Sequence, residues 1–211
     1  MSKLHLLFIA VLTFFAPGLS AQPTDPSLMK QREYAAYCIQ NLKDGTLVVR
    51  LNFKTKAINA LLQAGNTNGA NDIRYKQEEE NITIMKAFKK HFKFCPVYFV
   101  SFDSTIALVN GRQAGVFLND DLKPDPSIQL RSAFFLFAEY GMIETAVAPD
   151  KLNPEQETSQ RGIMEDALII SDKDLKLLKD PFPYYVHLGN WDARAKKLNK
   201  KFEKYYQLTL P

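Results

Sequence analysis

Three aspartates follow predicted strands, at the positions where α/β proteins usually place their chemistry. Asp103 follows VYFVSF, Asp120 follows GVFLN, and Asp172 follows ALIIS. If these strands are parallel neighbours, their carboxyl ends meet at one edge of the sheet. Carboxylates gathered there could bind Mg²⁺ or Ca²⁺, or could divide the roles of general acid and general base. One hypothesis is therefore a metal-assisted hydrolase whose catalytic residues are Asp103, Asp120 and Asp172.

The same residue types also have a purely structural interpretation, because short polar side chains cap helices. Ser171 with Asp174 three residues later matches a capping box that would open a helix over 175–180. Asp103 or Ser104 would cap a short helix that follows SFDS. A cap stabilises a helix by about 1 kcal/mol, which accounts for these residues without catalysis. The sequence therefore favours capping over a carboxylate active site.

Several well-known sets of catalytic residues are missing from the sequence. It contains no G-x-G-x-x-G, no G-x-x-x-x-G-K-[ST], no G-x-S-x-G, no H-E-x-x-H and no C-x-x-C. Beyond the leader, the only histidines are His91, which lies among lysines near a helix end, and His187, which lies on a predicted strand. Two histidines cannot build a three-histidine metal site. We therefore expect no cofactor.

The two cysteines of the chain, Cys38 and Cys95, allow one disulfide bridge. A bridge would close a loop of about 58 residues and would stabilise the fold by roughly 4 kcal/mol in the chain-entropy view. The alternative is that both are buried free thiols, which behave as small apolar side chains. The sequence does not contain the Cα separation that decides between these alternatives.

Two surfaces near the C-terminus are candidates for interaction. The last predicted helix has an apolar stripe that contains Phe202 and a basic opposite face that contains Lys197, Lys201 and Lys204. Such a helix can lie on an anionic membrane surface or bind an acidic partner, but the stripe is also typical of a helix packed on a sheet, and we favour packing. In PFPYYVHLG, Tyr184 and Tyr185 should face opposite sides of a strand, which would leave one of them free for a partner.

The first residues, MSKLHLLFIAVLTFFAPGLSA, have the features of a secretory signal peptide. They combine a charged start, a short apolar middle and small residues before a cleavage site, which we place at about residue 21. Because the first cysteine is Cys38, a lipid anchor at the new N-terminus is not expected. Removal of the leader takes away Lys3 and no acidic residue, so the net charge falls from +4 to about +3. This charge is too small to indicate a nucleic-acid partner.

Hydrophobic periodicity predicts one α/β domain over 22–211, with a mixed sheet of about five to seven strands packed with helices. A long helix is predicted over 72–92 after a loop at 65–71, and 132–148 is predicted as a strand, a turn and a second strand. The other predicted strands and helices cover 25–45, 46–52, 55–62, 95–103, 104–111, 114–120, 167–172, 184–189 and 191–205.

These observations lead to two main hypotheses about function. The leading one is an exported soluble domain, periplasmic or extracellular, that binds a protein or peptide of the cell envelope and has no catalytic activity. The alternative is the metal-assisted hydrolase. A third interpretation, attachment to a membrane surface through the last helix, is not favoured. The three aspartates separate the first two hypotheses, since the hydrolase requires them in one cleft.

Overall fold

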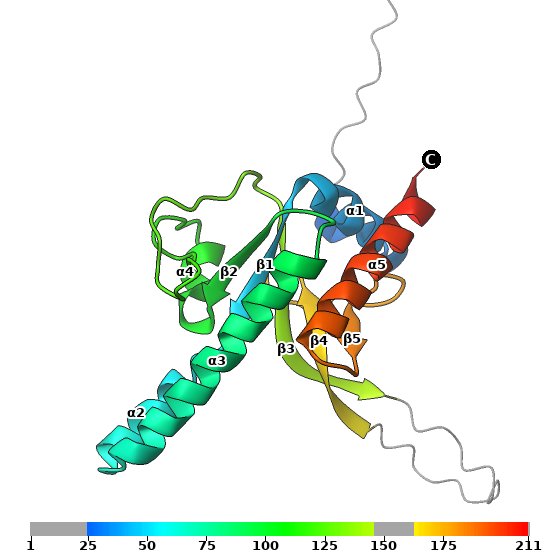
Figure 1. Cartoon of the computed structure of the whole chain (residues 1–211). Coiled ribbons are helices and arrows are strands. Elements are labelled where there is room, and N and C mark those ends of the chain that lie inside the picture. The colour runs from blue at the N-terminus through cyan, green and yellow to red at the C-terminus, as the bar shows by residue number, and fades with distance from the viewer. Residues whose placement is uncertain (1–24, 146–162, 211) are drawn as a thin grey trace, which may run out of the picture.

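The structure, a computed structural model, describes residues 25–145 and 163–210. The predicted leader over 1–21 lies outside the described residues, and so does most of the connector between the third and fourth strands. The described residues form a single mixed α/β domain with one five-stranded sheet and five α-helices (Figure 1). The prediction of a mixed sheet in an α/β domain is thus confirmed.

The sheet has the strand order β2-β1-β3-β4-β5. β1 lies between two parallel neighbours, β2 and β3, whereas β4 and β5 are antiparallel additions. This order places β2 at one edge of the sheet and β5 at the other. The bounds of the strands are β1 (Thr46–Leu51), β2 (Val97–Ser101), β3 (Phe135–Thr145), β4 (Ile163–Ser171) and β5 (Tyr185–His187).

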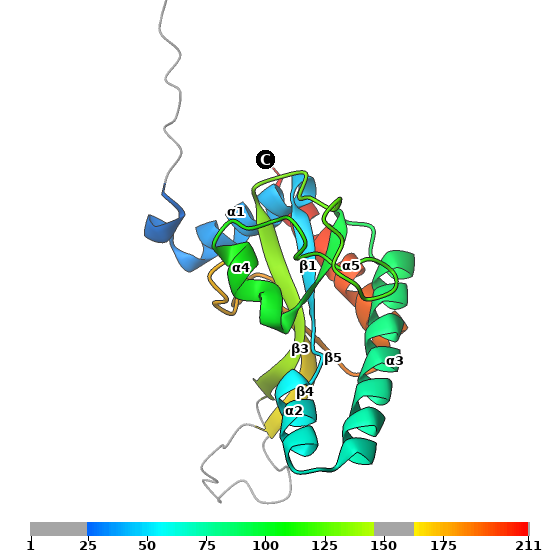
Figure 2. The same cartoon turned by 90° about the vertical axis from the view of Figure 1, so that its left-hand side faces the viewer.

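Helices cover both faces of the sheet. α3 (Thr67–His91) and α5 (Trp191–Thr209) lie on one face and α4 (Thr105–Val109) on the other (Figure 2). α1 (Gln31–Asp44) packs on the α5 face through its buried residues. α2 (Thr55–Gln63) runs beside the first half of α3, and this helix pair projects beyond the sheet (Figure 1). The sparse apolar content of the first half of α3 agrees with this projection.

The alternation of side chains in β1 divides the core into two parts. Leu47 and Val49 face the larger cluster under α1, α3 and α5, whereas Val48 faces the smaller cluster under α4. All three are buried because β1 is a central strand covered on both faces. Because β1, β2 and β3 are parallel, their amino ends lie together at one end of the sheet and their carboxyl ends at the other. Functional side chains can gather at either end.

α3 begins earlier than the sequence predicts. The prediction places a loop over 65–71, but the helix starts at Thr67, directly after Asn66. The Asn66 side chain accepts a hydrogen bond from the Gly69 N–H at 2.9 Å, which is the role of an N-cap. The Asn- and Gly-rich segment is thus the first turn of the helix, and Ala70 is completely buried there.

β3 is one continuous strand, although the sequence predicts a turn within it. Gly141 lies in the middle of the ladder with β4, opposite Ala167. A Cβ atom at position 141 would lie 2.5 Å from Cδ1 of Ile169, so the glycine makes room for a neighbouring side chain. The glycine marks a close approach between strands and not a turn.

The segment after β4 forms a turn and not the predicted helix. The Asp172 carboxylate accepts hydrogen bonds from the N–H groups of Asp174 (3.0 Å) and Lys176 (2.9 Å). Leu175 has a positive φ of 61°, and Leu177 then bridges back to Ser171. The capping box of Ser171 and Asp174 is therefore not formed, because Asp172 binds the backbone first and closes a tight turn.

Candidate functional site

The three predicted catalytic aspartates have different neighbours. Asp103 follows β2 and accepts a hydrogen bond from the Thr55 hydroxyl at 2.7 Å. Asp120 forms an ion pair with Lys89 beside the start of β2. Asp172 is buried and accepts a hydrogen bond from the Tyr34 hydroxyl at 3.0 Å.

The topology keeps these aspartates apart. β4 is antiparallel to β3, so Asp172 lies near the amino ends of β1 and β3. Asp103 lies at the opposite end of the sheet, after the carboxyl end of β2. Asp120, like Asp172, lies near the amino ends, but three strand spacings separate β2 from β4, which is about 14 Å. No cluster of three His, Cys, Asp or Glu side chains suited to a metal ion occurs in the described part of the chain. The geometry therefore provides no support for the hydrolase hypothesis.

An internal ion pair fills the crevice where open α/β sheets usually bind ligands. That crevice lies between the carboxyl ends of β1 and β3, because the connections from β1 and from β2 run on opposite faces of the sheet. Arg50 donates to Glu139 across it at 2.6 Å and to the Thr105 hydroxyl at 3.0 Å. The guanidinium also lies 4.1 Å from the ring centroid of Phe102.

Burial dominates the electrostatics of this pair. The side chains of Arg50 and Glu139 are only 11% and 15% exposed. Desolvation raises the pKa of Glu139, although the neighbouring cation opposes this shift, and the same desolvation lowers the pKa of Arg50. Both groups bind each other and the surrounding core, so the crevice is occupied by the protein itself.

Cys38 and Cys95 are free thiols, so the bridge that the sequence allows is not formed. Cys38 projects from α1 beside the Tyr34 hydroxyl, and Cys95 contacts the backbone of Leu47 just before β2. Burial raises the pKa of each thiol to about 12. The structure thus follows the alternative interpretation, in which both cysteines are buried apolar side chains.

The apolar stripe of α5 is buried within the protein. Ala195, Leu198 and Phe202 are completely buried, and Trp191 and Tyr205 pack against the same core. The apolar side of this helix therefore binds the sheet. No helix in the described residues is both long and apolar enough to cross a membrane.

The predicted interaction surface around Tyr184 and Tyr185 is partly bound internally. The two rings meet edge to face at 4.9 Å instead of pointing to opposite sides, since β5 begins only at Tyr185. Lys201 donates to the Tyr185 carbonyl at 2.8 Å. Lys197 and Lys204 are exposed, and their role in binding stays a prediction.

Only part of the outer side of edge strand β2 is covered. The Leu118 N–H donates to the Phe99 carbonyl at 2.9 Å, and Phe117 bridges Val100. The chain then turns at Asn119, whose side chain accepts the N–H of Asp121 at 3.0 Å. Residues 114–120, which the sequence predicts to form a strand, therefore contribute only isolated bridges.

Among residues 25–145 and 163–210, the start of β2 has outward-facing backbone groups without hydrogen-bond partners. The Leu47 N–H donates to the Pro96 carbonyl at 2.9 Å, which fixes the register of the parallel ladder. In this register Tyr98 directs its backbone groups toward β1, whereas Val97 and Phe99 direct theirs outward. Within the described part of the chain, no hydrogen bond reaches the N–H or carbonyl of Val97 or the N–H of Phe99.

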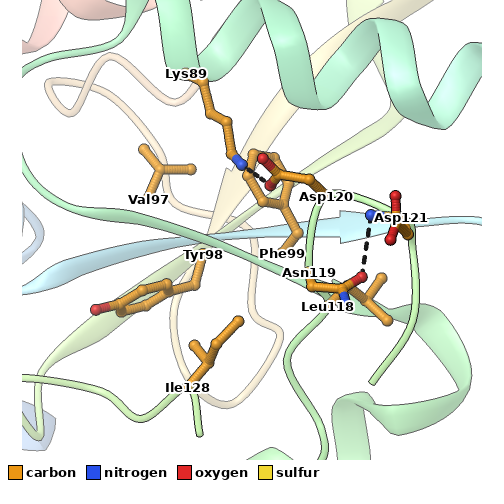
Figure 3. A pocket seen from close by; sticks show the side chains of 9 residues that line it. All are labelled: Lys89, Val97, Tyr98, Phe99, Leu118, Asn119, Asp120, Asp121 and Ile128. Atoms are coloured by element: carbon orange, nitrogen blue, oxygen red, sulfur yellow. Dashed lines mark hydrogen bonds and ion pairs between the residues drawn. The ribbon is translucent and has the colours of Figure 1, made fainter. Parts of the chain in front are cut away.

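An open hollow of about 410 Å³ adjoins these unpaired groups (Figure 3). Val97 and Tyr98 line it from β2, and Lys89 reaches over it from α3 toward Asp120. Asp121 stands beside Asp120 on the turn that follows Leu118. The Lys89 and Asp120 side chains are 47% and 80% exposed, so this ion pair is accessible to a ligand.

A second hollow of about 450 Å³ continues from the first and shares Lys89 and Val97 with it. Phe92, Phe94 and Pro96 contribute apolar walls, and the exposed residues Lys43 and Lys93 add positive charge. We call the two hollows together the β2 groove. Its lysine end consists of Lys43, Lys89 and Lys93, and its aspartate end consists of Asp120 and Asp121.

Comparison of the chain with protein-family models, curated proteins and solved structures finds no match.

Sequence reasoning singles out Asp120 and Cys95, each for another role, but misses the rest of the β2 groove. Lys89 resembles any exposed helical lysine, and the unpaired backbone of Val97 has no signature in its residue type. The buried ion pair had a detectable signal, because Arg50 and Glu139 each interrupt an apolar strand. A charged residue within a buried strand indicates a partner of opposite charge.

Proposed function

We propose that this protein is an exported, non-catalytic binding module of the cell envelope, and that the β2 groove binds an extended segment of a partner protein. The observation that carries this proposal is the set of unpaired backbone groups of Val97 and Phe99 at the rim of an apolar hollow. An extended peptide satisfies such groups by adding a strand to the sheet edge. The exported address rests on the leader over 1–21, which lies outside the described residues.

The charges of the groove indicate the chemistry of the bound segment. An acidic side chain or a terminal carboxylate would bind the lysine end, near Lys43 and Lys93. A basic side chain would bind the aspartate end, at Asp120 and Asp121. Apolar side chains between them would cover the partly exposed Val97 and Pro96. Catalysis has no role in this proposal, because the crevice between β1 and β3 is filled by Arg50 and Glu139.

The test uses peptides selected from a random-sequence library on the mature chain, with dissociation constants measured by fluorescence anisotropy. Val97→Pro removes an N–H that points away from β1, so it should leave the ladder intact and weaken binding at least ten-fold. Val97→Thr retains the N–H and serves as the matched control. Thermal unfolding should show that both variants remain folded.

The charge contribution is tested with the same peptides. Lys89→Glu should weaken binding at least ten-fold, whereas Lys86→Glu, which places the same charge change at another exposed position of α3, should change it less than two-fold. If Val97→Pro binds the selected peptides as tightly as the wild type, strand addition at β2 is wrong. If Lys89→Glu and Lys86→Glu weaken peptide binding equally, the effect is one of general charge, and the β2 groove is not the binding site.

A further inference from the structure

β3 and β4 extend beyond the rest of the sheet as a two-stranded arm. β1 pairs with β3 only up to Ala138, and β5 pairs with β4 only from Ala167 onward. In the described structure, residues 139–145 therefore have β4 as their only strand neighbour, and residues 163–166, which pair with 142–145, have β3 as theirs. Figure 1 shows this arm reaching past the lower ends of β5 and α5. We call these two segments the β3–β4 arm.

The β3–β4 arm exposes apolar side chains. Tyr140 is 44% exposed, and Met142, Met164 and Ile163 are 53%, 53% and 54% exposed. Two-stranded ribbons are marginally stable in water, and unpaired strand edges bind other chains readily. Methionine is adaptable in shape and is common on surfaces that bind partners. Within the described residues, the arm therefore combines exposed apolar side chains with two uncovered strand edges, which are features of a docking surface.

All charged side chains of the arm are acidic. They are Glu139, Glu144, Glu165 and Asp166, and the arm has no lysine, arginine or histidine. Glu139 is bound by Arg50, and Glu165 lies opposite Ile143 on the other face, so Glu144 and Asp166 are the carboxylates that a partner meets on the face of Met142 and Met164. This composition differs from that of the whole chain, whose net charge is +4. The partner surface that fits the arm is therefore basic.

Apolar and acidic side chains alternate on one face of the arm. Met142 lies opposite Asp166, and Glu144 lies opposite Met164, so these four share a face and form a checkerboard. Tyr140 is on the same face, with its ring 5.8 Å from the ring of Trp191 at the start of α5. Among the described residues, the face thus begins at this aromatic pair, over which the Arg194 guanidinium lies, and continues as an uncovered strip.

We propose that this face of the β3–β4 arm binds a segment of another protein that carries both apolar and basic side chains. Its apolar side chains would cover Met142 and Met164, and its lysines or arginines would pair with Glu144 and Asp166. Two copies of this arm would not bind each other face to face, because their acidic side chains would repel. An anionic membrane surface is disfavoured for the same reason. The arm lies on strands remote from β2, so this inference is independent of the β2 groove.

The test uses the full mature chain and two synthetic peptides of equal length, one with alternating leucine and lysine and one with alternating leucine and glutamate. Fluorescence anisotropy at physiological salt should show at least ten-fold tighter binding of the lysine peptide. Hydrogen exchange should slow at 139–145 and 163–166 when that peptide binds. Protection elsewhere, with no change in the arm, would overturn the proposal.

Three variants locate the interaction. Glu144→Lys combined with Asp166→Lys should weaken binding of the lysine peptide at least ten-fold. Met142→Ser combined with Met164→Ser should also weaken it, and this pair changes no charge. The control, Asp72→Lys combined with Glu78→Lys, makes the same charge change at exposed positions of α3 and should alter binding less than two-fold.

Two other outcomes would contradict the proposal. Losses as large in the α3 control as in the arm variants would mean that the lysine peptide senses only overall charge. Self-association in sedimentation experiments that the arm variants abolish would assign the arm to a second copy of this chain.

Discussion

At the scale of single residues, burial makes the two cysteine thiols, Cys38 and Cys95, unreactive. The Cys38 thiol lies beside the Tyr34 hydroxyl under α1, and the Cys95 thiol lies before β2. Desolvation disfavours the thiolate, which is the reactive form of cysteine, and raises the pKa of both groups to about 12. Neither cysteine is therefore prepared for nucleophilic or redox chemistry.

This environment predicts the reactivity of both thiols. At pH 8, which is about four units below these pKa values, roughly one thiol in ten thousand is ionised in the folded state. Iodoacetamide should therefore modify neither cysteine of the native protein at a rate close to that of a free thiol. In denaturant without reductant, mass spectrometry should show two alkylated cysteines. A mass that shows no alkylation under those conditions would mean that Cys38 and Cys95 form a bridge after all.

At the scale of elements, the turn after β4 depends on one carboxylate. Asp172 accepts two backbone N–H groups of its own turn and the hydroxyl of Tyr34 from α1. Ser171, in contrast, has a buried hydroxyl without a hydrogen-bond partner in the described residues. The residue that holds this element is therefore Asp172 and not the serine that a capping box would require.

Two substitutions separate the observed turn from the predicted helix. Asp172→Ala should lower the free energy of unfolding by about 2 to 3 kcal/mol, because it leaves donors at a buried site without an acceptor. Ser171→Ala removes a hydroxyl that has no partner and should change stability by less than about 0.5 kcal/mol, whereas loss of a capping box would cost about 1 kcal/mol. Urea unfolding measures both values. A larger loss for Ser171→Ala than for Asp172→Ala would support the helix.

At the scale of the whole molecule, one aromatic residue of α5 joins segments that are distant in sequence. Phe202 is completely buried, and its ring meets those of Phe92, Phe94 and Phe182 at 5.8, 5.6 and 5.4 Å. These partners come from the end of α3, the approach to β2 and the approach to β5. α5 thus connects the part of the core beside β2 with the part beside β5. Through Phe92 and Phe94 it also supports the wall of the lysine end of the β2 groove.

Removal of this contact should therefore affect the whole fold. Phe202→Ala should lower the free energy of unfolding by about 3 to 5 kcal/mol, as for other aromatic residues truncated in a core. Lys204→Ala, at an exposed position of the same helix, should change it by less than about 0.5 kcal/mol. Chemical denaturation followed by circular dichroism tests both variants. Equal small effects would show that α5 is not part of the cooperative core.

Sequence reasoning predicted the elements better than the site. The alternation in TLVVRLN indicated β1, and the stripe that contains Phe202 indicated a packed α5, because such periodicities are local properties of the chain. It misread Gly141 and the segment after Asp172, where the outcome depends on Ile169 across the ladder and on backbone groups around the turn. The β2 groove has little signal in the sequence, since only Asp120 and Cys95 among its members are singled out, each for another role.

The amino-acid sequence is therefore sufficient to predict the α/β class and most of the strands and helices, and to show the absence of several catalytic motifs. The folded molecule is needed to show that Asp103, Asp120 and Asp172 lie apart, that Arg50 binds Glu139, and that β2 is an edge strand. The physical reason is the range of the interactions. Patterns of apolar side chains act over a few residues, whereas strand order, strand direction and uncovered edges arise from hydrogen bonds between segments that are far apart in the chain.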